Sequence, residues 1–167
     1  MEAPSRFAYK SEVLSVAEKT AAYEDAVGQL DALLAGESHP ILKMATINCV
    51  LRDALPYYYW VGFYLVHDRE LVVGPYQGTL GCLHISFDRG VCGAAARTGA
   101  VQIVPDVEQF PGHIACDSNS RSEICVPVRD ETGELIAVFD VDSTEPSSFD
   151  DVDEAFLSQI IRQYFGR

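Results

Sequence analysis

The stretch EICVPVRDETGELIAVFDVD, residues 123–142, has the pattern of a β-hairpin and decides the fold. Two apolar runs, 124–128 and 135–142, flank a turn sequence, DETG, at 130–133. Successive side chains of a strand point to opposite faces, so each run has two faces. Both faces of the second run begin with apolar residues, which indicates a strand that is covered on both sides. The hairpin therefore predicts a sheet with other elements packed against it.

Four further runs are predicted to be strands, and helical patterns lie before, between and after them. Short turns join several neighbouring strands, which favours antiparallel pairing of the runs at 57–66, 71–74, 82–87 and 101–104. Apolar residues at helical spacing predict helices over 11–35, 40–56 and 91–97 and after Ser148, where Asp151 suggests a capping box. We expect an α+β fold with a six-stranded, mainly antiparallel sheet and packed helices.

The composition limits the size of the protein and its partners. A chain of 167 residues with 48% hydrophobic residues fits one domain, residues 1–167, on which a helix at about 11–35 packs. The formal net charge of −13 opposes nucleic acid and anionic lipid, because binding to either relies on Lys and Arg. We expect no secretory signal and no membrane span, since neither pattern occurs.

The cysteines indicate the redox environment. An odd number without a signal sequence favours a reducing compartment, so we expect a cytoplasmic protein whose thiols are free and whose disulfides are transient or catalytic: Cys49, Cys82, Cys92, Cys116 and Cys125. A zinc site is disfavoured because its ligands would have irregular spacing: Cys82, His84, Cys92 and Cys116. Cys92 begins a predicted helix, whose dipole would lower the pKa of the thiol.

A loop without helical or strand periodicity precedes the hairpin, within residues 105–123. Such a long loop is usually functional or disordered. Disorder fits poorly, because the loop contains residues that pack or react: Phe110, His113, Ile114 and Cys116. Two interpretations remain, a surface loop with an ordinary buried cysteine or a lid that carries a reactive thiol, Cys116, over a pocket.

Three acidic residues of the hairpin are predicted to converge. Asp140 and Asp142 share one face of the second strand, and Glu123 shares a face of the first with Cys125. If these faces meet, three carboxylates lie at the end of a mostly apolar cavity, and their repulsion raises the pKa of at least one. A protonated carboxyl donates a hydrogen bond, whereas ionised neighbours bind an ammonium group. The alternative is that all three are solvated acids at strand ends.

Several motifs occur together and in order along the chain: WVGFY (60–64), GPYQG (74–78), GVCG (90–93), VPDV (104–107), FPGHIACDS (110–118), SEI (122–124) and DVDS (140–143). In the first, a glycine between two aromatic residues on one face either leaves room for a close approach or belongs to ordinary aromatic packing. The set resembles the free methionine-(R)-sulfoxide reductases, a family of stand-alone GAF domains. The resemblance covers roughly residues 40–165. Its most specific part is FPGHIACD with the two upstream cysteines.

The resemblance implies a GAF-like fold and a thiol-dependent reduction of free L-methionine-(R)-S-oxide to methionine. Cys116 matches the nucleophile, which becomes a sulfenic acid; a second thiol then forms a disulfide with it, and a thioredoxin-type protein reduces this bond. Cys82 and Cys92 are the candidates for the second thiol. We favour Cys82, because the glycines of the preceding loop permit movement, and we expect Cys92 to act as a relay or backup. Cys49 and Cys125 are expected to be dispensable.

The resemblance also implies the substrate contacts and the partners. Trp60 and Tyr64 match positions against the thioether, while the ammonium group and the sulfoxide oxygen would contact Glu123, Asp140 and Asp142. No metal or organic cofactor is required, and homodimer formation is left open. Cys125 departs from the pattern, because an aliphatic residue is expected at that position of the strand.

Two other functions remain as alternatives. One is a GAF module that senses a small ligand without chemistry, although we expect such a module to have a partner domain to regulate, and none is visible in 167 residues. The other is a thiol hydrolase that uses Cys116 with His113, although no oxyanion-hole motif accompanies the pair. Consumption of reducing equivalents in the presence of methionine sulfoxide distinguishes a reductase from both.

Overall fold

The computed structural model describes residues 11–166, so the predicted domain extends at both ends beyond the described residues. The elements follow one another as α1 (Val16–Leu33), α2 (Pro40–Ala54), β1 (Trp60–His67), β2 (Glu70–Gln77), β3 (His84–Ser86), α3 (Gly90–Thr98), β4 (Gln102–Val104), η1 (Val107–Gln109), β5 (Ser122–Arg129), β6 (Leu135–Ser143) and α4 (Asp151–Phe165). Within residues 11–166, no helix combines the length and apolar character needed to cross a bilayer.

The strands form one sheet in the order β3-β2-β1-β6-β5-β4, and every neighbouring pair is antiparallel. The predicted fold class is therefore confirmed. The hairpin of β5 and β6 closes at Asp130, whose carboxylate accepts hydrogen bonds from the backbone N–H groups of Thr132 (2.9 Å) and Glu134 (3.1 Å). Gly133 has φ +89°, a conformation that glycine adopts without strain. These turn residues fix the register in which β5 meets β6.

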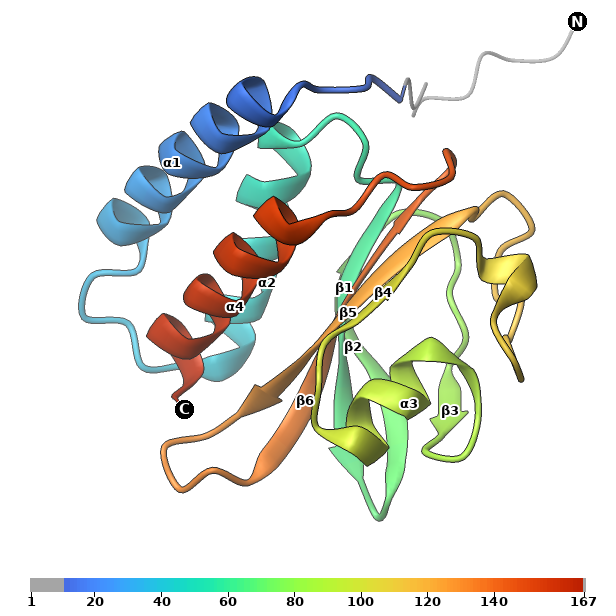
Figure 1. Cartoon of the computed structure of the whole chain (residues 1–167). Helices are drawn as coiled ribbons and strands as arrows, with labels where there is room; N and C mark the ends of the chain where they lie inside the picture. The colour runs from blue at the N-terminus through green and yellow to red at the C-terminus, as the bar shows by residue number, and fades with distance from the viewer. Residues whose placement is uncertain (1–10, 167) are drawn as a thin grey trace, which may run out of the picture.

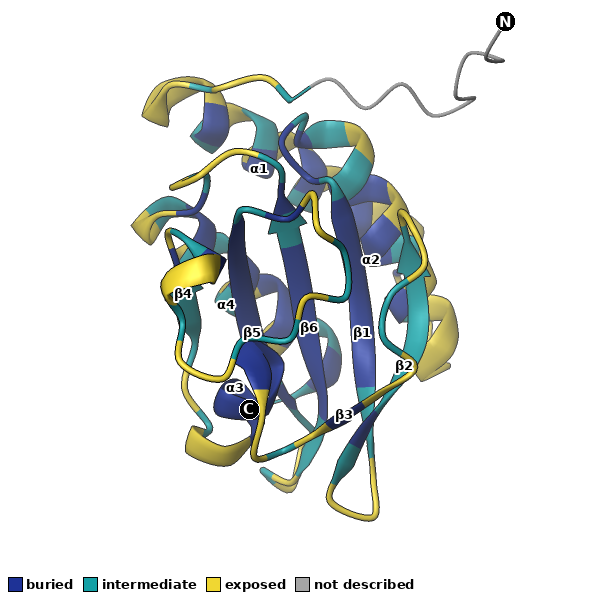
Figure 2. Cartoon of the chain, turned by 90° about the vertical axis from the view of Figure 1, so that its right-hand side faces the viewer, coloured by how far each residue is buried: buried dark blue, intermediate teal, exposed yellow. Residues whose placement is uncertain are grey.

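Each face of the sheet is covered by different elements. Figure 1 shows α1, α2 and α4 together on one face and α3 on the other. The larger core lies between the three helices and alternate residues of the strands, among them Val61, Phe63, Ile124, Phe139 and Val141. Figure 2 shows β1, β5 and β6 buried along most of their length, and a second core joins residues of these strands to α3. The central strands are thus covered on both faces, as the hairpin pattern predicted.

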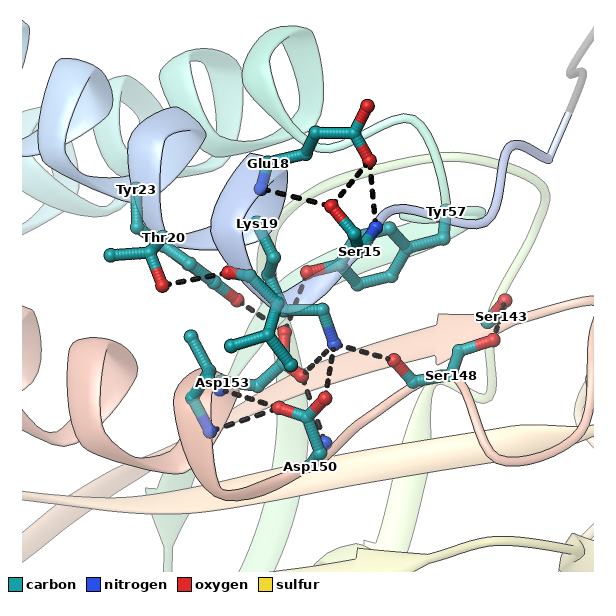
Figure 3. A network of polar contacts seen from close by, with 12 residues as sticks. Ser15, Glu18, Lys19, Thr20, Tyr23, Tyr57, Ser143, Ser148, Asp150 and Asp153 are labelled. Carbon is teal, nitrogen blue, oxygen red and sulfur yellow. Dashed lines mark hydrogen bonds and ion pairs between the residues drawn. The ribbon is translucent and has the colours of Figure 1, made fainter.

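A buried polar cluster fixes α1 and α4 to the start of the sheet (Figure 3). The carboxylate of Asp153, which has no exposed surface, accepts hydrogen bonds from Lys19 Nζ (2.6 Å), Tyr23 OH (2.7 Å) and Tyr57 OH (2.6 Å). Burial raises the pKa of Tyr23 well above its usual value, so its hydroxyl stays a donor. Each buried polar group of the cluster has a hydrogen-bond partner, which compensates for its loss of contact with water. The cluster therefore holds α1 in a fixed orientation on the domain.

The start of α4 differs from the prediction. The capping residue is Asp150, whose carboxylate accepts from the backbone N–H of Val152 (2.9 Å), and its partner in the capping box is Asp153. Ser148 instead donates to Ser143 Oγ (2.8 Å), within the turn that follows β6. The hydroxyl that was predicted to cap the helix is therefore used by the turn before it.

Candidate active site

A cleft of about 520 Å³ lies between the sheet, the start of α3 and the loop that precedes β5. The wall and floor contain both apolar and ionisable side chains: Trp60, Tyr64, Leu80, Gly81, Ile85, Gly90, Val91, Cys92, His113, Ile114, Cys116, Asp117, Ser120, Glu123, Asp140 and Asp142. Seven of the eight candidate site residues line it, and the eighth, Cys82, is bonded to Cys116. Of the two interpretations of the loop, the structure therefore favours a lid over a pocket.

Aromatic side chains from β1 and β2 form one wall of the cleft. Trp60 stacks against Tyr64, with ring centroids 5.6 Å apart, and against Tyr76 at 5.2 Å. The indole N–H of Trp60 donates to the carbonyl of Thr79 (3.0 Å), which fixes the ring plane. A Cβ atom at Gly62 would lie 2.7 Å from a Trp60 ring carbon. The same Cβ would lie 2.4 Å from Tyr76 Cβ, so the space beside Gly62 is occupied by both Trp60 and Tyr76.

The three acids meet on the floor of the cleft because of the register of the hairpin. Glu123 of β5 lies opposite Asp142 of β6, and Cys125 lies opposite Asp140. Glu123 and Asp140 are only 6% and 5% exposed, and Asp142 lies nearer to the solvent. The geometry of the acids therefore disagrees with the alternative of solvated residues at strand ends.

Burial raises the pKa of all three carboxyl groups, because the charged form loses its hydration. The pKa of Asp140 rises only to about 6, since hydrogen bonds from Cys125, Cys92 and Glu123 stabilise its ionised form. The charge on Asp140 also disfavours ionisation of Glu123 and Asp142. The pKa values of these two carboxyl groups therefore lie well above the usual range. Near neutral pH, the floor then has one ionised carboxylate beside protonated carboxyls, which suits one ammonium group and one hydrogen-bond acceptor.

A disulfide joins the two loops that border the cleft. Cys82, between β2 and β3, is bonded to Cys116 of the lid loop, with 5.2 Å between their Cα atoms. Asp117 adds a polar connection, because its carboxylate accepts from Tyr59 OH (2.8 Å) and Thr79 Oγ1 (2.5 Å). Partial burial opposes ionisation of Asp117, but these hydrogen bonds hold its pKa below the usual range. The loops therefore close on each other in the oxidised chain.

The thiol of Cys92 behaves differently from the prediction. Cys92 does lie in the first turn of α3, but burial raises the pKa of its thiol well above the usual value. Charge on the nearby acids Asp140 and Glu123 acts in the same direction. Loss of hydration in a site that already contains carboxyl groups outweighs the modest field of a helix end. The thiol of Cys125 lies 3.4 Å from that of Cys92 and is buried with it.

Four side chains beneath the cleft could hold a metal ion. One donor atom from each lies within 4.8 Å of the others: Cys92, Glu123, Cys125 and Asp140. This set differs from the zinc ligands weighed from sequence. Cys82 and Cys116 of that set are bonded to each other, and His84 lies at the surface, 3.1 Å from Glu70.

Residues that sequence reasoning did not assign also contribute to the cleft. Ser120 hydrogen-bonds Asp142, and Asp117 joins the two loops. Asp117 directly follows Cys116 in the quoted motif, which is the signal that pointed to it. His113 also lines the cleft, and partial burial lowers its pKa, so the neutral imidazole predominates at neutral pH.

The fold and the cleft together define a GAF domain, and residues 50–164 match the sequence profile of the GAF domain family. The chain is 45% identical to GAF domain-containing protein A of Dictyostelium discoideum over 150 residues, 89% of this chain and 94% of that one. It is 42% identical to the free methionine-R-sulfoxide reductase of Escherichia coli over 145 residues, 87% of each. The structure of free methionine-R-sulfoxide reductase from Neisseria meningitidis in complex with its substrate matches with a TM-score of 0.83 and 38% identity over 92% of each chain. The chain belongs to the family of free methionine-R-sulfoxide reductases, which are oxidoreductases.

Proposed function

We propose that this chain reduces free methionine-(R)-sulfoxide to methionine with Cys116 as its nucleophile. The observation that carries the proposal is one cleft that Cys116 shares with two stacked aromatic rings and three carboxyl groups, two of them buried. A sulfoxide with a nearby ammonium group matches this set of side chains. Membership of the reductase family supports the same reaction.

The reaction divides between the thiols of the two loops. The thiolate of Cys116 attacks the sulfoxide sulfur, methionine leaves, and the oxygen stays on Cys116 as a sulfenic acid. The thiol of Cys82 then attacks this sulfur, and water leaves as the disulfide forms. The Cys82–Cys116 bond in the structure is consistent with the product of this step.

The carboxyl groups supply both kinds of contact that the substrate needs. Glu123 stays protonated near neutral pH, because burial and the charge of Asp140 raise its pKa, so it donates a hydrogen bond to the sulfoxide oxygen. Asp140 ionises first and, with Asp142 beside it, attracts the ammonium group. Trp60 and Tyr64 enclose the thioether carbons by their ring faces.

The enclosed acids favour the free amino acid over a peptide. An amide in place of the ammonium group would leave buried carboxyl groups unmatched, at about 1–3 kcal/mol for each. We therefore expect little reduction of N-acetylmethionine sulfoxide, measured at the same concentration as free methionine sulfoxide. Comparable rates on the two compounds would contradict the proposed role of the acids.

Recycling of the disulfide requires an external donor. Cys82 and Cys116 are each partly exposed, unlike the buried Cys92 and Cys125, so a thioredoxin-type protein of the cytoplasm can attack their bond. This accessibility favours the loop cysteines as the pair that the donor reduces. A homodimer is compatible with the same reaction, because the described residues supply the whole cleft.

The decisive experiment supplies the (R) and (S) epimers of free methionine sulfoxide separately to the reduced protein. We expect methionine from the (R) epimer, little from the (S) epimer, and none from Cys116→Ser even in a single turnover. Cys49→Ser is the matched control, because Cys49 is an exposed free thiol on α2. Formation of methionine by Cys116→Ser would refute the assigned nucleophile.

Substitution of the acids tests the floor of the cleft independently of the thiols. Glu123→Gln and Asp142→Asn should each lower kcat/KM by a factor of about 10²–10⁴, which is typical for loss of a positioned acid. Glu108→Gln, an exposed acid of η1, controls for loss of charge alone. Near-normal turnover by either cleft variant would show that these acids do not touch the substrate.

A further inference from the structure

We propose that Cys92 and Cys125 form a second redox-active dithiol, which takes over oxidation from the Cys82–Cys116 disulfide. A fully reduced chain would then complete two turnovers before it needs an external donor. The inference rests on the proposed reductase activity and adds to it an internal store of reducing equivalents.

The two buried thiols are close enough to bond. Cys92 lies in α3 and Cys125 in β5, elements that pack directly on each other, and their sulfur atoms are 3.4 Å apart. A disulfide bond is about 2 Å long, so the sulfurs must approach by a further ~1.4 Å. Helices at packed interfaces shift by about 1–2 Å in many proteins. A small displacement of α3 toward the sheet is sufficient.

Proton acceptors lie beside both thiols. Cys125 Sγ donates to Glu123 Oε1 (3.2 Å) and to Asp140 Oδ1 (3.4 Å), and Cys92 Sγ lies 3.9 Å from the same Glu123 oxygen. A thiol attacks a disulfide as its thiolate, so a nearby base is required when burial disfavours the charge. The carboxylate of Asp140, whose Oδ1 accepts from Cys125 Sγ, is placed to serve as this base.

The cleft connects the two pairs of cysteines. Cys92 and Cys116 both line it, so the two pairs meet at one cleft. Cys92 loses its proton and attacks Cys116 Sγ, which forms a Cys92–Cys116 bond and releases Cys82 as a thiolate that is then protonated. Cys125 next attacks Cys92 Sγ, which forms the Cys92–Cys125 disulfide and releases Cys116. Two electrons move from the buried pair to the loop pair, and protons balance.

The buried position of the second pair explains why it would act as a store. Cys125 has no exposed surface and Cys92 only 2%, so an external protein cannot attack their sulfurs. Oxidation and re-reduction must both pass through Cys116, whose side chain is partly exposed. The expectation that Cys125 is dispensable then holds for the first turnover but not for the second.

The test counts methionine formed without a reductant. The protein is fully reduced, freed of reductant and mixed with excess free methionine-(R)-sulfoxide, and methionine is measured per chain when the reaction stops. We expect about two from the wild type and about one from Cys125→Val or Cys125→Ala. Cys49→Ser, which changes a thiol far along the chain on α2, should still give about two. Peptide mapping of the wild type should find both disulfides.

The outcomes distinguish failure of the second dithiol from failure of the reductase activity. One methionine per wild-type chain would overturn the second dithiol and leave the reductase activity in place. None would overturn both. About two from Cys125→Val would assign the extra equivalents to other thiols. The first methionine from that variant also reports that it is folded. If the variant gives none, mapping of the wild type decides, and absence of a Cys92–Cys125 bond refutes the inference.

Discussion

Replacing Asp140 with asparagine removes a carboxyl group that stays protonated in the folded chain at pH values where an ordinary aspartate is already ionised. Burial raises the pKa of Asp140 from 3.8 to about 6, even though hydrogen bonds from Cys125 and Cys92 favour its charged form. A pKa difference is a free-energy difference of about 1.36 kcal/mol per pH unit. Ionisation of Asp140 therefore costs the folded state about 3 kcal/mol relative to the unfolded chain.

The direction in which stability changes with pH follows from proton binding. Between about pH 4 and pH 6, the folded chain keeps a proton that the unfolded chain releases, so the free energy of unfolding falls as pH rises. Above the folded pKa, the contribution of Asp140 is constant. Asp140→Asn cannot ionise, so the decline between pH 4 and pH 8 should be smaller in this variant by about 2–3 kcal/mol. The difference displaces the midpoint of unfolding in urea by roughly 1–2 M.

The assay is urea unfolding of the reduced, substrate-free proteins at pH 4 and pH 8. Glu108→Gln makes the same change from carboxyl to amide at an exposed position of η1, and it should follow the wild type. If Asp140→Asn shows the pH dependence of the wild type within about 0.5 kcal/mol, the carboxyl is already ionised in the folded chain at pH 5. The charge that we derive for the floor of the cleft would then be wrong.

Two further changes test other parts of the structure. Lys19→Met removes the cation from the fully buried Asp153, and we expect a loss of about 3–5 kcal/mol in urea unfolding. Glu70→Gln, which breaks an exposed pair with a histidine, should change stability by less than about 1 kcal/mol, and equal losses would contradict the role of burial. Gly62→Ala adds a methyl group 2.4 Å from Tyr76 Cβ and 2.7 Å from the ring of Trp60, so this aromatic wall must shift and KM should rise about tenfold or more. The fluorescence of Trp60, the only tryptophan, reports whether the ring has moved.

Alternation along the strands made much of the fold and of the cleft floor predictable. Ile124 and Val126 were expected on one face of β5 and Cys125 on the other, and the structure buries them in different cores. The same rule correctly separated Phe139 from Asp140 on β6. Period-two patterning is a local property, so it can be read without knowing which strands are neighbours.

Contacts between distant elements were not predictable in the same way. The position of Cys125 on its strand face was clear, but its contact with Cys92 depends on how α3 docks against the sheet. For the same reason, the thiol pKa of Cys92 was predicted in the wrong direction, because its helix position is local and its burial is not. The cap of α4 was misplaced because Ser148 and Asp150 are both good capping residues, and the turn after β6 decides between them.

Because β5 and β6 pair in a fixed register, the side chains that reach the cleft depend on the number of residues between the cleft and the distant turn. Glu123 lies opposite Asp142 because the chain reverses at Asp130, with one irregularity in the pairing between Val128 and Arg129. Deletion of one residue along this arm would turn Glu123 toward the helices and an isoleucine toward the cleft, whereas deletion of two would restore the acid to its side. Deletions of an even number of residues therefore keep Glu123 on the side of the cleft. Deletions of an odd number turn it toward the hydrophobic core.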